Sequence, residues 1–427
     1  MRARRPRGAR ISGVRVLPAL AAAVVGFAGC TSPSAAPGEP SPAPASPSPS
    51  ASAVGRTPTP TPVPAEPTEP AAPAEPEQCN VLIDRLTPEE RIGQLFMVGK
   101  TSTEPVTEEY RQMLATTHVG SVVLLGNSRE GTARVKELTD SLRHSAAAPE
   151  SIGLLIAVDQ EGGQVQRLKG PGFDTMPSAR VQANRPVPEL ERSAAHWGRQ
   201  LVAAGVDANL APVADVVPAN RVANNAPVGQ LERHYGETVA EVSPRVAAVV
   251  RGFDEAGITT SVKHFPGLGH VAGNTDFAAG VNDTSITRRD PGLAAFKAGT
   301  DAGADMVMIG TATYARIDPG VPAAFSSVVI ERMVRQDMGF NGVVISDDLG
   351  VAQQVSDVAP GERAVRFLAA GGDLVINGDP RLQAEMTRAV TERAAADPAF
   401  AERLRVKVQR VVDMKARGGQ VTCLPPA

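Results

Sequence analysis

The chain has 427 residues, of which 42% are hydrophobic and 21% are charged, and its formal net charge is −3. This length and hydrophobic content suffice for one large domain or two ordinary ones. A mildly acidic chain gives no support to nucleic-acid binding, which needs a basic face, so we expect no nucleic-acid partner.

Residues 1–29 are typical of a secretion signal. They hold six arginines and no acidic residue, and their apolar run from Val14 to Phe27 is shorter than a membrane span. Small residues stand directly before Cys30, which resembles the lipobox of bacterial lipoproteins. The resemblance implies that Cys30 is lipidated and anchors an exported protein to the outer face of the cytoplasmic membrane. The alternative is an ordinary signal peptide without an anchor.

Residues 30–78 have the composition of a linker. Apart from Cys30 they are mostly Pro, Ala, Ser, Thr and Glu, with no aromatic residue. Such a segment cannot bury enough apolar surface to offset the entropy of ordering, so we expect it to be disordered. At roughly 3 Å per residue, a proline-rich tether of this length spans on the order of 100 Å. It could therefore be a spacer from a membrane into a cell wall, or a disordered tail without a role.

From Cys79 onward, short apolar segments alternate with helical patterns. Eight segments are predicted strands: Phe96–Gly99, Ser121–Gly126, Leu154–Val158, Ala208–Val213, Thr259–Val262, Met306–Gly310, Gly342–Ser346 and Leu374–Asn377. One predicted helix begins near Pro88, before the first strand. Others are predicted over Thr132–His144, Val187–Ala204, Thr238–Ala256 and Ala323–Met338. This alternation predicts one (β/α)8 TIM-type barrel over residues 79–427, with a doubly wound open sheet as the alternative. Pro212 lies inside the fourth segment, so that strand should be irregular or short.

Two cysteines flank the predicted barrel. Cys79 opens it and Cys423 lies near the end of the chain. Exported proteins enter a compartment that permits disulfides, and closing a barrel brings its first and last elements together. We therefore predict a Cys79–Cys423 disulfide.

Polar residues gather where the predicted strands end. They are Asp159–Arg167 after the third strand, Asp215 after the fourth, Lys263–His270 after the fifth, and Asp347 and Asp348 after the seventh. In a parallel barrel these positions converge on one face, where the chemistry takes place. One of the paired aspartates could instead cap a helix. The glycines nearby fit no phosphate-binding fingerprint, and no His, Cys and carboxylate residues stand at metal-ligand spacing, so we expect neither a cofactor nor a metal.

Three ordered motifs resemble glycoside hydrolase family 3. They are DQEGGQVQRL from Asp159, KHFPGLGH from Lys263 and GVVISDDLG from Gly342. The similarity covers about residues 80–415, as one catalytic barrel without the second domain of many relatives. The KHFPG motif and the single-domain layout resemble more narrowly the bacterial exo-β-N-acetylglucosaminidases of peptidoglycan turnover. The resemblance implies a carbohydrate substrate, and we expect a monomer.

The resemblance also implies roles for individual residues. Asp347 matches the nucleophile, which forms a covalent glycosyl intermediate in a retaining mechanism. The positions that match residues holding the non-reducing sugar are Asp159, Arg167, Lys263, His264 and Arg233. His264 could instead be a structural residue that orients the neighbouring lysine.

The acid/base departs from the pattern of these enzymes. The subfamily has a histidine thirteen residues after the motif lysine and an aspartate two positions before that histidine, whereas this chain has Asp276 and Asn274 there. Asp276 is the first candidate, because carboxylic acids serve as the acid in many glycosidases. It would need a pKa raised by partial burial or by the charge of Asp347. His270 on the same loop is the alternative, since the intrinsic pKa of histidine suits the task.

The altered dyad leaves other functions open. The same barrel could serve a β-glucosidase, or a GlcNAc phosphorylase that transfers the sugar to phosphate. It could also be a non-catalytic sugar-binding lipoprotein.

Overall fold

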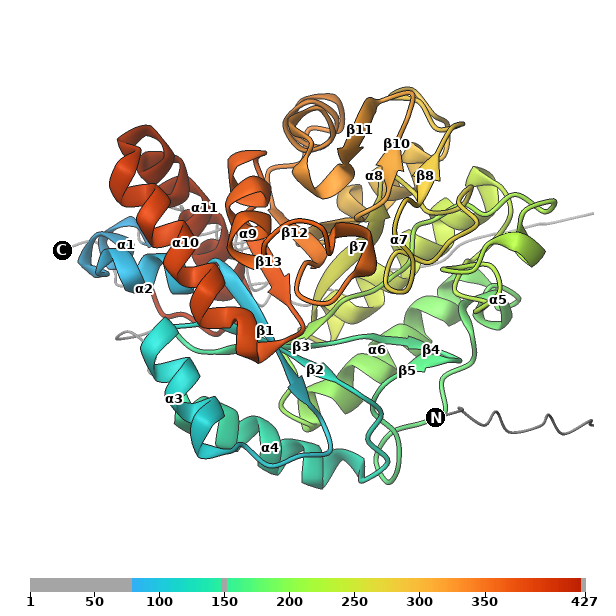
Figure 1. Ribbon diagram of the computed structural model, residues 1–427. Coiled ribbons are helices and arrows are strands. Elements are labelled where there is room, and N and C mark those ends of the chain that lie inside the picture. The colour runs from blue at the N-terminus through green and yellow to red at the C-terminus, as the bar shows by residue number, and fades with distance from the viewer. Residues whose placement is uncertain (1–78, 147–151, 424–427) are drawn as a thin grey trace, which may run out of the picture. The chain divides into compact units, whose positions relative to one another are not determined.

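The computed structural model describes residues 79–146 and 152–423 (Figure 1). Its centre is a closed barrel of parallel strands in the order β1-β13-β12-β9-β7-β6-β3-β2. These strands are β1 (Phe96–Thr101), β2 (Ser121–Leu125), β3 (Leu155–Val158), β6 (Ala208–Asn209), β7 (Thr259–Phe265), β9 (Met306–Ile309), β12 (Val343–Asp348) and β13 (Leu374–Asn377). The predicted (β/α)8 barrel is confirmed, and the open sheet is excluded.

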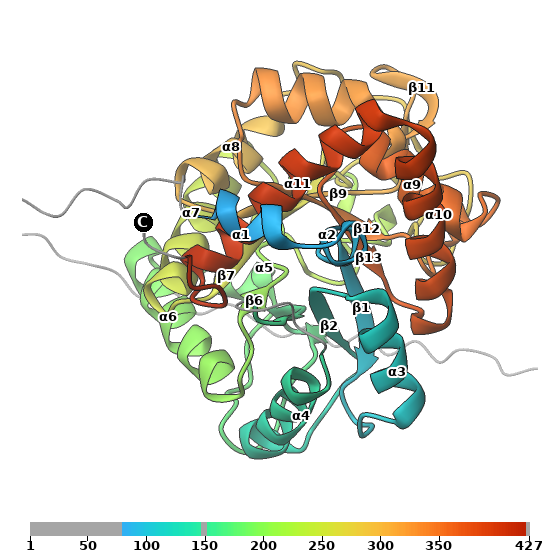
Figure 2. The same cartoon turned by 90° about the vertical axis from the view of Figure 1, so that its left-hand side faces the viewer.

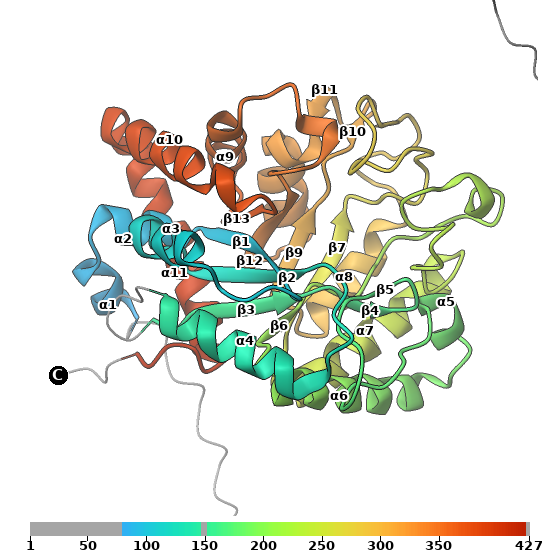
Figure 3. The same ribbon diagram turned by 60° about the horizontal axis from the view of Figure 1, so that its bottom comes forward.

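Helices form a ring around the strands (Figure 2). They are α1 (Asn80–Arg85), α2 (Pro88–Gly93), α3 (Glu108–Thr117), α4 (Gly131–Ser145), α5 (Ala179–Gln182), α6 (Val187–Ala203), α7 (Val239–Glu255), α8 (Leu293–Asp301), η4 (Val328–Asp337), α9 (Pro360–Ala369), α10 (Gln383–Ala396) and α11 (Pro398–Arg417). Figure 3 shows α4 and α6 running along the outside of the barrel. The helix predicted over Ala323–Met338 is divided into a 3-10 turn at Ala323–Phe325 and the π-helix η4.

The barrel strands are apolar because helices cover one side and the barrel interior fills the other. Every residue of β7 is buried, as are the first four residues of β12. Such strands read as continuous hydrophobic runs in the sequence, which is why their places could be predicted. Strand β6 has only two residues and ends before the Ala211–Pro212 bond, in agreement with the expected irregularity.

The loops that leave the carboxyl ends of the strands carry short strands of their own. After β3 the chain forms the pair β4 (Gln160–Gly162) and β5 (Val165–Gln166). In the loop after β7, β8 (Asn282–Asp283) pairs with β10 (Thr313–Tyr314), which also pairs with β11 (Asp318–Pro322). The β8–β10 pair ties the loop after β7 to the loop after β9, whereas the other two pairs each stiffen a single loop.

The first and last elements meet at the amino-terminal end of the barrel. Cys79 and Cys423, the pair named from the sequence, form a disulfide with their Cα atoms 5.0 Å apart. Nearby, α1 packs against α11, and Arg405 of α11 pairs with Asp84 of α1 at 2.7 Å. The bridge therefore lies at the end of the barrel opposite the loops that follow the strands.

The amino-terminal predictions fall outside the described residues. These are the signal peptide at 1–29, the lipidation site Cys30 and the linker at 30–78. Within the described residues no helix is both long and apolar enough to span a membrane.

Candidate active site

A cavity of about 460 Å³ opens at the carboxyl ends of the barrel strands. Its polar wall comes from Asp159, Arg167, Arg233, Lys263, His264, Asn274, Asp276, Asp347 and Asp348. The cavity floor is apolar and includes Leu210, Met308 and Ile376. Segments that lie far apart in the sequence thus converge on one site, as a parallel barrel requires.

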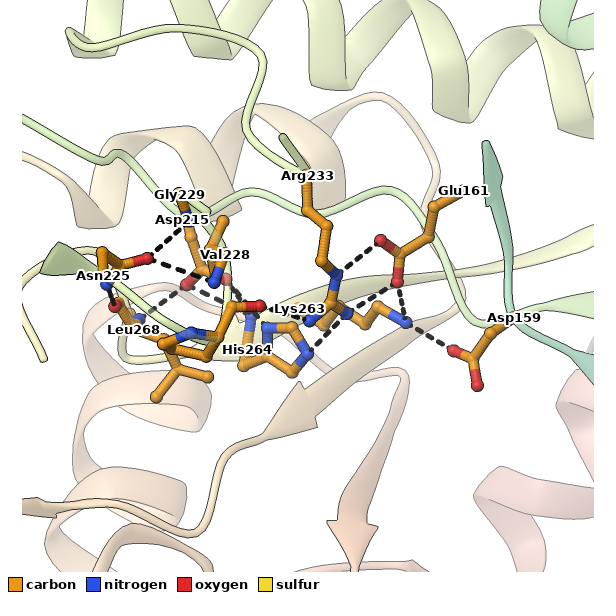
Figure 4. A network of polar contacts seen from close by, with 12 residues as sticks. Asp159, Glu161, Asp215, Asn225, Val228, Gly229, Arg233, Lys263, His264 and Leu268 are labelled. Carbon is orange, nitrogen blue, oxygen red and sulfur yellow. Dashed lines mark hydrogen bonds and ion pairs between the residues drawn. The ribbon is translucent and has the colours of Figure 1, made fainter. Parts of the chain in front are cut away.

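An ion-pair network forms one wall of the cavity (Figure 4). Lys263 Nζ lies 2.5 Å from Asp159 Oδ1 and 2.7 Å from Glu161 Oε1. Arg233 donates to both oxygens of Glu161, through Nε at 2.8 Å and Nη2 at 2.7 Å. Glu161 is buried between the two cations, so it fixes the positions of both.

This network keeps its members charged in spite of their burial. Burial alone would raise the pKa of Glu161, but the charges of Arg233 and Lys263 hold that pKa well below its usual range. Burial would likewise lower the pKa of Lys263, but the Asp159 and Glu161 carboxylates raise it. Charged donors and acceptors at fixed positions can recognise the hydroxyl groups of a sugar.

His264 is held by a second buried carboxylate. Its Nδ1 lies 2.8 Å from Asp215 Oδ2, and its Nε2 lies 3.3 Å from Arg233 Nη2. Because an arginine can only donate, His264 Nε2 accepts from Arg233 and the ring proton lies on Nδ1, facing Asp215. His264 therefore orients Arg233 rather than the lysine that precedes it, and it also lines the cavity.

Glu161 and Asp215 are the positioning residues to which sequence reasoning gave no role. Both were visible as polar residues after predicted strands, Glu161 inside the DQEGG motif and Asp215 after the fourth strand. Their partners, however, lie 72 residues away for Glu161 and 49 residues away for Asp215. Only the barrel brings the members of each pair together.

The paired aspartates at the end of β12 differ in their contacts. Asp348 Oδ1 accepts hydrogen bonds from the backbone N–H groups of Gly350 and Gly378, at 2.8 and 2.9 Å. Burial raises the pKa of Asp348. Asp347 lines the cavity, and its Oδ1 accepts only the N–H of Asp348, at 2.9 Å, among the described residues. Asp348 is thus occupied in tying two strand ends together, and Asp347 is open to a ligand.

Asp276 lines the same cavity from the loop after β7. Asp276 is exposed as a whole residue, but burial of its carboxyl in the cavity wall and the negative charge of Asp347 raise its pKa to about 6. Its backbone N–H donates to Asn274 Oδ1 at 2.9 Å, and its carbonyl accepts from the Gln353 N–H at 3.3 Å. The loop is therefore tied to the segment that follows Asp347.

His270 does not line this cavity. It borders a separate hollow of about 300 Å³, with Glu237, Pro266 and Asp290 among the other lining residues. The geometry thus favours Asp276 over the alternative acid/base His270.

Arg167 keeps a free donor beside the cavity. Its Nε is buried and has no hydrogen-bond partner among the residues that the structure describes. A buried donor without a partner is costly, so a ligand acceptor at this point would be favourable. No group of three or more potential metal ligands was found within residues 79–146 and 152–423.

A parallel barrel whose cavity brings Asp276 and Asp347 together with fixed charged groups, at the carboxyl ends of its strands, has the architecture of a glycoside hydrolase. The glycosyl hydrolase family 3 N terminal domain matches residues 87–414, and the chain belongs to this family. The sequence is 33% identical over 308 residues to a beta-hexosaminidase of Stenotrophomonas maltophilia strain K279a, covering 70% of this chain and 88% of the relative.

Solved structures agree with this assignment. The crystal structure of a beta-N-acetylhexosaminidase from Beutenbergia cavernae is 40% identical, with a TM-score of 0.76, and the match covers 78% of this chain and 99% of that chain. LpqI from M tuberculosis is 27% identical, with a TM-score of 0.68, over 80% of this chain and 96% of that chain. The chain is therefore a glycoside hydrolase of family 3.

Proposed function

We propose that this protein is a retaining exo-β-N-acetylglucosaminidase that removes terminal β-linked GlcNAc from peptidoglycan fragments or related glycosides. The choice of sugar rests on the relatives, which are named as hexosaminidases in S. maltophilia and B. cavernae. The observation in this chain that carries the proposal is the pair Asp347 and Asp276 in one cavity, where the pKa of Asp276 is raised to about 6.

The two carboxylates divide the chemistry between them. The Asp347 carboxylate attacks the anomeric carbon of the bound sugar while protonated Asp276 gives its proton to the glycosidic oxygen. The bond between that carbon and that oxygen breaks, and the leaving group departs as an alcohol. Asp276, now ionised, takes a proton from the water that attacks the same carbon and releases Asp347. Two displacements return the sugar with its original β configuration.

The remaining polar residues would hold the sugar during both steps. Asp159 can accept from its hydroxyl groups, and Arg167 and Arg233 can donate to its oxygens. Lys263 and His264 complete the wall of the cavity. Because Glu161 and Asp215 fix these groups in advance, little ordering is left to occur when substrate binds.

The charge of the cavity favours water over phosphate as the acceptor. When the acceptor enters, Asp347 is esterified and uncharged. The carboxylates of Asp159, Glu161, Asp348 and the ionised Asp276 still outnumber the cations of the site, which are Arg167, Arg233 and Lys263. Both Lys263 and Arg233 are already paired with carboxylates. A dianionic phosphate would therefore meet a net negative site, which supports hydrolysis over phosphorolysis.

The proposal is tested by comparing p-nitrophenyl β-GlcNAc with p-nitrophenyl β-glucoside, each with and without phosphate. We expect turnover of the GlcNAc glycoside, release of free GlcNAc in both buffers, and no turnover by Asp347→Ala. Preference for the glucoside, or formation of a sugar phosphate, would point to one of the alternative enzymes. Binding of GlcNAc without turnover at high enzyme concentration would point to a sugar-binding protein.

The place of action follows from the amino-terminal sequence. A lipidated Cys30 and a linker of about 50 residues would hold the barrel within reach of cell-wall fragments. Cys30→Ser should move the protein from the membrane fraction to the medium or the soluble exported fraction. Unchanged recovery with membranes would contradict the lipid anchor.

A further inference from the structure

Phe277 stands out among the surface side chains of the barrel. Its side chain is 82% exposed, whereas the other large hydrophobic side chains exposed in the described residues are valines at 46–50%. Exposed apolar residues scattered singly need no explanation. Phe277, however, follows Asp276 directly and lines the active-site cavity. An aromatic ring at the mouth of a polar cavity is placed to meet a ligand.

The backbone under Phe277 is fixed. The N–H groups of Phe277 and Ala278 both donate to the Asn274 carbonyl, at 3.1 and 2.9 Å, which closes a tight turn. The Gln354 side chain clamps the end of the same loop through both the N–H and the carbonyl of Val281, at 2.8 and 3.2 Å. The ring therefore lies on a turn whose backbone is already ordered by hydrogen bonds. A ligand that packs on the ring does not have to order that backbone first.

The cavity mouth contains further apolar surface. Val351, which is 50% exposed, lines it from the segment after β12, and Pro227 and Leu231 line it from the segment that carries Arg233. The charged residues that would hold the terminal sugar are Asp159, Arg233 and Lys263, which come from different loops or strands. The site thus has a charged part and an apolar part.

The chemistry decides which part of the substrate meets the ring. The group that donates the proton must reach the glycosidic oxygen, which joins the terminal sugar to the leaving group. In an exo-acting enzyme the terminal sugar fills the cavity and the leaving group extends toward solvent. The ring of Phe277 follows the donor Asp276 and lines the cavity while remaining 82% exposed, so it lies on the leaving-group side of the cleaved bond. A β-linked pyranose presents a face of C–H bonds, and covering an exposed aromatic ring with that face removes apolar surface from water.

We propose that Phe277 is a specificity-determining residue that packs against the sugar ring of the leaving group. This inference rests on the proposed function, because it takes Asp276 as the acid and a GlcNAc glycoside as the substrate. It predicts that Phe277 raises kcat/KM for substrates whose leaving group contains a ring, and has no such effect on substrates whose leaving group has none.

Two substrates separate the leaving group from the rest of the reaction. The β-1,4-linked disaccharide of GlcNAc has a sugar leaving group, and GlcNAc β-fluoride has a leaving group with no ring. We expect Phe277→Ala to lower kcat/KM for the disaccharide about tenfold more than for the fluoride. Phe277→Trp should keep the wild-type ratio within about twofold, since it restores an aromatic face. Val202→Ala, at a valine of α6 that is 48% exposed, is the matched surface control and should leave the ratio unchanged.

An equal loss on both substrates would overturn the proposal, because it would mean that Phe277 acts on a step that both substrates share, such as binding of the terminal sugar. No loss on the disaccharide would overturn it as well. A loss that acts through Asp276 would fall mainly on the disaccharide, because fluoride leaves with little help from an acid, so the pH dependence has to separate that case. Phe277→Ala should keep the pH dependence that the wild type shows on the disaccharide, and a shifted profile would overturn the proposal by placing the effect at Asp276. If the wild type hydrolyses the fluoride, the proposed function stands whatever Phe277 does. If it hydrolyses neither substrate, both proposals fail.

Discussion

At the scale of single residues, the two carboxylates proposed for catalysis differ in their surroundings. Asp347 lies at the end of a rigid barrel strand, whereas Asp276 lies on a loop and feels the charge of Asp347. That charge and the burial of Asp276 favour its protonated form, which is the form that an acid needs. The same pairing lets Asp276 serve as the base once Asp347 has been esterified and has lost its charge.

The first prediction concerns pH. Because the raised pKa of Asp276 is about 6, its acid form is present below that pH and is lost as the pH rises through it. For a disaccharide with a poor leaving group, kcat/KM should therefore fall about tenfold per unit above pH 6. Asp276→Asn should remove this limb and lower kcat/KM roughly 10²- to 10⁴-fold, with a smaller loss for p-nitrophenyl β-GlcNAc. A descending limb that persists in Asp276→Asn would assign the proton to another group.

The sequence predicted these residues more completely than it predicted their supports. The motifs named Asp159, Lys263 and Asp347, and all three line the cavity. The departure from the subfamily pattern singled out Asp276, whose environment has the burial and neighbouring charge that an acid requires. The support given by Glu161 could not be predicted, because it depends on contacts between distant strands.

At the scale of elements, all eight barrel strands lie where the apolar runs predicted them. Short strands in the loops escaped prediction, since a pair such as β4 and β5 has too few residues to show an alternating pattern. The π-helix η4 was predicted only as a helix, because hydrophobic spacing does not reveal a change in hydrogen-bonding register. The local sequence pattern predicts well whether a segment is a helix or a strand. It does not predict which loop segments pair, because that pairing depends on tertiary contacts.

The second prediction concerns the end of β12. Asp348 joins β12 to the residue after β13 by accepting the N–H groups of Gly350 and Gly378. The Val351 N–H also donates to the same oxygen, at 3.2 Å, so Asp348→Ala leaves three donors without their acceptor and should lower the free energy of unfolding by about 2 kcal/mol. Asp348→Asn keeps an acceptor oxygen and should cost less than half as much, as measured by urea denaturation. Equal costs for the two variants would mean that the charge of Asp348, and not its hydrogen bonds, stabilises this end of the strand.

At the scale of the whole molecule, the barrel separates stability from chemistry. The disulfide and the contacts of α11 lie at the amino-terminal end of the strands. Lys415 of α11 donates there to the carbonyls of Gly120 and Gly153, just before β2 and β3. The residues proposed for catalysis lie at the opposite end, where barrel enzymes generally carry their active sites. Changes at one end should therefore leave the other end largely intact.

The third prediction uses this separation. The Cys79–Cys423 bridge links residues 344 positions apart and restricts the unfolded chain strongly. Cys79→Ser should lower the free energy of unfolding by about 3 kcal/mol, measured by urea denaturation without reductant. Its kcat and KM below the transition should match the wild type. Two free thiols in the mature wild-type protein, found by mass spectrometry, would contradict the bridge.

The central claim is that Asp347 forms a covalent bond with the sugar. A fluorinated GlcNAc fluoride that forms the glycosyl intermediate quickly and releases it slowly should trap that bond. Digestion and mass spectrometry should then find the added sugar mass on the peptide that contains Asp347, with Asp276 unlabelled. An enzyme that turns over GlcNAc glycosides but carries no label, or carries it on another residue, would contradict this account.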